Sequence, residues 1–141
     1  MSKLKLSLDD SDERSENFIL GIVSSSSHLK FVDTLNKTGH FDFCRTNDLA
    51  AESKSEAEYF IYFTYFDNET QTDFKLIKNR GSNGLVGKEL KGMDYLLMIQ
   101  TENTDLIQSL KEVLNNLRIV QAVALISEKQ LSERTKRILP F

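Results

Sequence analysis

The sequence predicts an α+β fold, a two-layer sandwich in which two helices cover one face of a mostly antiparallel sheet. Three observations lead to this prediction. Short apolar runs recur between turn signals, two segments place their apolar residues on one helical stripe, and an aromatic run is followed closely by a second strand-like run. Packing both helical stripes on one face of a sheet buries them with the fewest layers.

Composition sets the size of the fold and excludes several functions. A chain of 141 residues with 40% hydrophobic and 28% charged residues suits a single domain spanning 1–141. One cysteine and two histidines leave no disulfide framework and no cysteine-rich zinc site, so neither a metal nor a cofactor is predicted. The net charge of −3 argues against a nucleic-acid partner, which favours a basic surface.

The chain lacks the signals of secretion and membrane insertion. Its start has no apolar core of a signal peptide. No window approaches the roughly 18 consecutive apolar residues that a spanning helix needs. We therefore expect a cytoplasmic protein with no membrane partner.

The first third predicts an edge strand, a central strand and a helix. Residues 1–17 combine a lysine–leucine alternation, typical of an edge strand, with an acidic loop. Residues 18–23 form an apolar run typical of a central strand. Ser24–Ser27 can cap the helix that follows, and Gly39 ends it. The predicted apolar face of this helix carries Leu29, Val32 and Leu35.

The middle third predicts a β-hairpin. Residues 47–57 are polar and are expected to form a loop. Tyr59–Phe66 is the densest aromatic run, which suits a strand, and residues 73–78 are its returning partner. In a single strand the alternate side chains share a face. We expect one such face to be an interface; it carries Tyr59, Ile61, Phe63 and Tyr65.

The last third predicts a split β-α-β unit. Residues 95–99 and 119–126 are apolar strands on either side of a helix that begins near Thr104. The polar tail 127–141 is expected to pack on the domain. Together these elements predict a ferredoxin-like sheet with the aromatic hairpin added to it, and the final β-α-β is similar to the second half of an ACT-type regulatory domain.

Residues Gly87–Tyr95 resemble the central motif of a small bacterial family, which is named for its Ile-Pro-Glu-x-x-x-Val-Asp-Tyr pattern. Glu89, Asp94 and Tyr95 match that motif, whereas a glycine and a lysine stand in place of its isoleucine and proline. The lysine–leucine start and the small-residue turn after the first apolar strand are also similar. The resemblance implies a divergent member, a compact bacterial domain, and supplies no mechanism.

Two segments are candidates for binding an anionic ligand. Ser26 and Ser27 can offer hydroxyls and N–H groups at a helix N-terminus, where the dipole favours anions. The loop that follows the hairpin offers a guanidinium, amides and permissive glycines. The alternatives are capping for the serines and a plain turn for the loop. The loop candidates are Asn79, Arg80, Asn83 and Gly84.

Glu89, Asp94 and Tyr95 are candidates for acid–base chemistry, provided that they meet in one pocket. The alternative is local structure, with Asp94 at a strand entry and Tyr95 packed in the core. Cys44 and the two histidines have no reactive spacing and are interpreted as structural.

These features leave three functional hypotheses. The first is a non-catalytic interaction or regulatory module that forms a homodimer or binds another protein, because Tyr59–Phe66 and Ile119–Ile126 are apolar on both faces. Its alternative is core packing on both faces, with the tail as cover. The second hypothesis is a sensor that binds an anionic metabolite near Arg80 and the Ser24–Ser27 turn. The third is a minor enzyme that uses Glu89, Asp94 and Tyr95.

Overall fold

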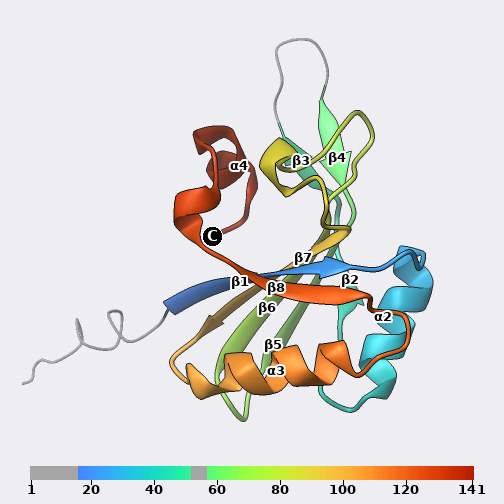
Figure 1. The fold of residues 1–141 in the computed structure, drawn as a ribbon, viewed down its shortest axis with the longest axis vertical. Coiled ribbons are helices and arrows are strands. Elements are labelled where there is room, and N and C mark those ends of the chain that lie inside the picture. Colours follow the sequence, from blue (N-terminus) through green and yellow to red (C-terminus); the bar gives the residue numbers. More distant parts are fainter. Residues whose placement is uncertain (1–15, 52–56) are drawn as a thin grey trace, which may run out of the picture.

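The computed structural model describes residues 16–51 and 57–141 (Figure 1). The predicted edge strand near the start of the chain lies outside these residues. The elements, in chain order, are β1 (Glu16–Val23), α2 (His28–Lys37), β2 (Cys44–Arg45), β3 (Leu49–Ala51), β4 (Glu58–Phe60), β5 (Tyr62–Asp67), β6 (Thr72–Lys78), the 3₁₀ turn η1 (Lys88–Leu90), β7 (Tyr95–Thr101), α3 (Asp105–Asn115), β8 (Ala122–Ile126), η2 (Glu128–Gln130) and α4 (Glu133–Ile138).

Six strands form the main sheet, in the order β2-β5-β6-β7-β1-β8. Every neighbouring pair in it is antiparallel, which confirms the predicted α+β class with an antiparallel sheet. β1 lies between β7 and β8, so β7-α3-β8 is the split unit that the sequence predicts. A second, two-stranded sheet joins β3 to β4.

The helices α2 and α3 cover one face of the main sheet (Figure 1). Ser27 caps α2 by accepting a hydrogen bond from the Lys30 N–H. The buried side of α2 carries Phe31 in place of the predicted Leu29, which is 69% exposed. The stripe that packs is therefore Phe31, Val32 and Leu35, and it meets Ile107, Leu110 and Leu114 of α3 in the first core cluster.

The opposite face of the sheet carries a third layer, so the predicted two-layer sandwich needs correction. The central strands are apolar on both faces: in β7, Leu97 points to the first cluster and Leu96 to a second one. The second cluster is covered by β4, by the loop between β6 and β7, and by the tail. Figure 1 shows α4 and the β3–β4 sheet on this side, away from α2 and α3. The covering side chains include Phe60, Val86, Leu90, Leu131 and Leu139.

The aromatic run is two strands, which corrects the single strand Tyr59–Phe66. The run breaks at Ile61: β4 pairs with β3 in the small sheet, and β5 stays in the main sheet. Just before the break, Phe60 packs closely against Gly81, where a Cβ would come within 2.5 Å of its ring carbons. The predicted 47–57 loop is corrected as well: it contains β3, which pairs with β4.

The tail is fastened by polar contacts as well as by burial. Lys75 donates a hydrogen bond to the Pro140 carbonyl at 2.7 Å, and Leu139 is buried. Among the residues that the structure describes, no helix has the length and apolar character to span a bilayer.

Candidate functional site

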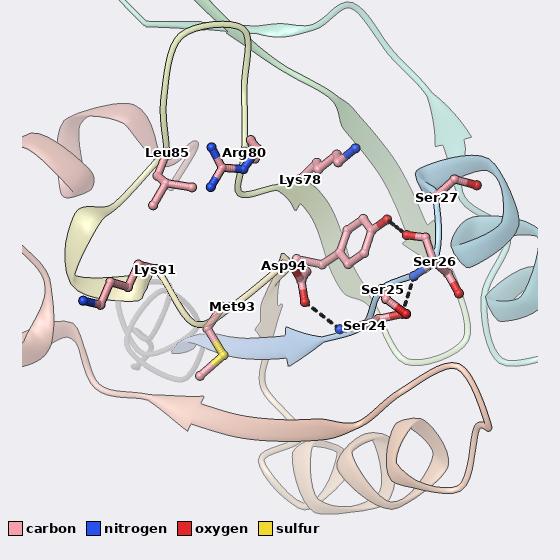
Figure 2. Close-up of a pocket in the computed structure, with 11 residues that line it drawn as sticks. Ser24, Ser25, Ser26, Ser27, Lys78, Arg80, Leu85, Lys91, Met93 and Asp94 are labelled. Carbon is pink, nitrogen blue, oxygen red and sulfur yellow. Dashed lines mark hydrogen bonds between the residues drawn. The ribbon is translucent and has the colours of Figure 1, made fainter.

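A cavity of about 220 Å³ opens where β1 ends, β6 ends and β7 begins (Figure 2). Figure 2 shows the serine turn on one side of the cavity and Lys91 on the opposite rim, with Arg80 and Lys78 between them. The cavity is lined by Ser24, Ser25, Ser26, Ser27, Lys78, Arg80, Leu85, Lys91, Met93, Asp94 and Tyr95.

The serine turn is held by contacts to both neighbouring strands. Ser24 donates its N–H to Asp94 Oδ2 at 2.8 Å and its hydroxyl to the Ile119 carbonyl at 2.5 Å. The Ser26 N–H donates to Ser24 Oγ at 3.3 Å. Because Ser24 is buried and hydrogen-bonded on both sides, the serine turn lines the cavity as a fixed segment.

Tyr95 forms the inner wall of the cavity. Its ring stacks on Phe31 at 4.1 Å, and its hydroxyl donates to the Ser26 carbonyl at 2.7 Å. Burial, assisted by the nearby Asp94 charge, raises the pKa of Tyr95 to about 12. The phenol is therefore protonated at neutral pH and acts as a fixed donor that positions the turn.

Three cations line the cavity: Lys78, Arg80 and Lys91. Within residues 16–51 and 57–141, no carboxylate lies within ion-pair distance of any of them. Burial, assisted by the charges of Lys78 and Arg45, lowers the pKa of His28 at the start of α2. The chain carries a net charge of −3, yet three positively charged side chains line this one cavity.

Asp94 is the negative group of the cavity. Its carboxylate lines the wall while Oδ2 accepts the hydrogen bond from Ser24. Asp94 lies between the serine turn and the start of β7. Its carboxylate can therefore also accept a hydrogen bond from a bound molecule.

Among the predicted ligand residues, Ser26, Ser27 and Arg80 line this cavity, whereas Asn79, Asn83 and Gly84 do not. Asn79 is fully buried and braces the loop from inside: its amide donates to the Leu90 carbonyl at 2.8 Å and to the Met93 carbonyl at 2.9 Å. The Gly84 carbonyl accepts a hydrogen bond from the Gly81 N–H at 2.7 Å, which closes the turn that also contains Asn83.

The structure separates Glu89 from the other two motif residues. Asp94 and Tyr95 line the cavity, but Glu89 lines a different hollow against the tail. Its carboxylate accepts hydrogen bonds from the Ser132 N–H at 2.6 Å and the Thr135 hydroxyl at 2.9 Å. Burial opposes ionisation, but these hydrogen bonds prevail and hold the pKa of Glu89 below its usual 4.5.

The site residues that sequence reasoning missed are Lys78, Leu85, Lys91 and Met93. Lys78 ends an ordinary alternating strand, and Lys91 lies in a polar turn, so neither stands out locally. The signal that could have identified these residues is the strand topology. The strands on either side of the 79–94 loop pair with each other, and the Asn79 N–H donates to the Asp94 carbonyl, which brings both ends of the loop to one place.

The predicted interface residues lie in two environments. Phe63 is buried in the first core cluster, and Ile61 and Tyr65 pack against that cluster. Tyr59 belongs to the small sheet and is 50% exposed. Among the described residues, no group of three or more histidine, cysteine or acidic side chains is placed to hold a metal ion.

The comparisons with known proteins add no relative. No family model, no curated protein and no solved structure matches this chain. Membership of the family with the Ile-Pro-Glu-x-x-x-Val-Asp-Tyr motif therefore stays a prediction.

Proposed function

We propose that the protein is a sensor or binding domain for a small anionic metabolite, which it takes up in the cavity between the serine turn and the 79–94 loop. The observation that carries this proposal is the gathering of Lys78, Arg80 and Lys91 around one hollow, without a carboxylate partner among the described residues. Cations close together repel one another, and an anion between them removes that cost.

The chemistry of the walls narrows the ligand class. Arg80 offers a planar fork of donors suited to a phosphate or carboxylate, and the serine hydroxyls add neutral donors beside the start of α2. Asp94 adds an acceptor for a hydroxyl or ammonium group of the same ligand. The volume of about 220 Å³ lies below the roughly 300–1,000 Å³ of drug-sized pockets, so a compact ligand with one or two acidic groups fits best.

The strand order supports a ferredoxin-like core for this domain. β6, β7, β1 and β8 lie side by side, and the helices that follow β1 and β7 pack on the same face. In this interpretation β2–β5 are an insertion between α2 and β6. The insertion, the loop after β6 and the tail form the third layer, and the same loop forms one wall of the cavity.

Ligand-dependent thermal stabilisation tests the proposal. Inorganic phosphate, pyrophosphate and citrate are titrated at constant ionic strength set with sodium chloride, since a ligand that binds the native state raises its stability. We expect at least one of these anions to raise the melting temperature in a saturable manner. Arg80→Ala should weaken its binding by about 2 kcal/mol, the scale of a charge-assisted hydrogen bond.

The matched control is Arg137→Ala, because Arg137 is also exposed but belongs to α4 and does not line the cavity. Its variant should respond to the anion as the unmodified chain does. An equal loss in both variants, or no saturable response to any of the three anions, would contradict the proposed function.

A further inference from the structure

The two edges of the main sheet differ in how they are protected. At one edge, β2 has two residues, one of which is Arg45, paired with Asp48 at 2.7 Å. At the other edge, β8 pairs with β1 on one side and with no strand of the described residues on the other. Short, charged edge strands resist pairing with further strands, whereas a regular uncharged edge invites it.

β8 lacks the usual protection of an edge. Its five residues, Ala122–Ile126, include no charge and no proline, and their register with β1 runs without a bulge. Leu125 is 52% exposed on this strand. The N–H and C=O groups on the outer side of β8 therefore lie among apolar side chains and have no strand partner within the described residues.

We propose that β8 pairs with β8 of a second copy of the chain, antiparallel about a two-fold axis, so that two main sheets become one. Such a pair sets a strand against itself, and like charges directly opposite each other would destabilise it. The neutrality of Ala122–Ile126 meets that requirement. With Ala124 at the axis, Leu125 of each copy comes opposite Val123 of the other, which covers part of the exposed leucine.

The charges beyond the strand ends fit the same alignment. In an antiparallel pair the start of β8 in one copy lies beside the end of β8 in the other, so the segment that carries Arg118 comes beside the segment that carries Glu128 of the second copy. Both residues are exposed, and neither forms an ion pair with another described residue. The two-fold axis repeats this opposite-charge contact at both ends of the interface. This surface is distinct from the anion cavity, and neither proposal depends on the other.

Sedimentation equilibrium of the full chain, from micromolar to several hundred micromolar, measures the association directly. We expect a species of twice the 16.2 kDa chain mass. Leu125→Lys should raise the dissociation constant at least about tenfold, because it places a charge at a close cross-strand contact. Leu29→Lys is the matched control, since Leu29 is 69% exposed on α2, and it should leave association unchanged.

Circular dichroism shows whether Leu125→Lys still folds. If it does not, exchanging the charges of Arg118 and Glu128 tests the interface instead. Arg118→Glu and Glu128→Arg should each weaken association about threefold, the scale of an exposed ion pair, and the double variant should restore it. A chain that stays monomeric throughout would overturn the proposal, and so would a dimer unaffected by a folded Leu125→Lys. A double exchange no tighter than the single ones would overturn the proposed alignment.

Discussion

The charged side chains on the two sides of the loop between β6 and β7 differ in whether they have partners. On the side facing the tail, Glu58 pairs with Arg134 at 3.1 Å, and Glu89 accepts hydrogen bonds from two residues of the tail. On the side facing the serine turn, Lys78, Arg80 and Lys91 have no ion-pair partner among the described residues. The comparison shows that the charges on one side are used within the fold, whereas those on the other side are left without an ion-pair partner among the described residues, as the proposed anion site requires.

Asn79→Ala should give the largest effect, because Asn79 braces the loop that both sides share. Removing its amide leaves the Leu90 and Met93 carbonyls without their donor, and the Gly87 N–H loses its acceptor at 3.4 Å. We expect the free energy of unfolding to fall by about 3 kcal/mol in urea denaturation. Asn115→Ala, at an exposed position of α3, is the control and should change it little. An equal loss of stability in the two variants would contradict the role of the Asn79 side chain in holding the loop.

Arg134→Ala tests the paired side. Arg134 donates to Glu58 Oε1 and to the Val86 carbonyl, while Glu58 Oε2 is buried without a hydrogen bond. Removing the guanidinium leaves a largely buried carboxylate unpaired, and we expect a loss of about 2 kcal/mol because Arg134 itself is 43% exposed. Arg137→Ala on the same helix should cost little. Anion binding should persist in Arg134→Ala; its loss would show that the two sides are not separable.

Glu89→Gln should give the smallest effect, and one that depends on pH. The pKa of Glu89 is lower in the folded chain than its usual 4.5, so ionised Glu89 stabilises the fold above that pH and this contribution is lost as pH falls through the folded pKa. We expect the variant to lose about 1 kcal/mol at pH 7. The difference between the variant and the unmodified chain should shrink below about pH 4.5. A difference independent of pH would contradict the assigned hydrogen bonds.

Local periodicity predicted much of the helix-covered face, although it placed Leu29 rather than Phe31 on the buried side of α2. The stripe of α3 and the apolar strands beside it are local patterns, and Ser27 caps α2 as the serine run indicates. The serine turn and Arg80 were each recognised as candidates. Their meeting in one cavity with Lys78 and Lys91 depends on strand order, which spacing along the chain does not encode.

The second face was anticipated only in part: core packing on both faces with the tail as cover was one of the two alternatives, but the cover that β4 and the 79–94 loop add comes from distant segments. Phe60, just before the break at Ile61, contacts Gly81 of the distant loop. The tail is held by the hydrogen bond from the Ser132 N–H to Glu89 and by the bond from Arg134 to the Val86 carbonyl. An aromatic run has the same alternation whether it forms one strand or two. Glu89 matches the family motif beside Asp94, but only the folded chain shows that it faces the tail.

The most direct test of the central claim is a two-dimensional ¹H–¹⁵N NMR titration of the full chain with inorganic phosphate at constant ionic strength. The proposed site predicts saturable shifts of the Ser25, Ser26 and Ser27 amides together with the Arg80 side-chain Nε–H signal. Arg80→Ala should abolish these shifts, and Arg137→Ala should preserve them. Non-saturable shifts spread evenly over exposed arginines and lysines would contradict a built anion site between the serine turn and the 79–94 loop.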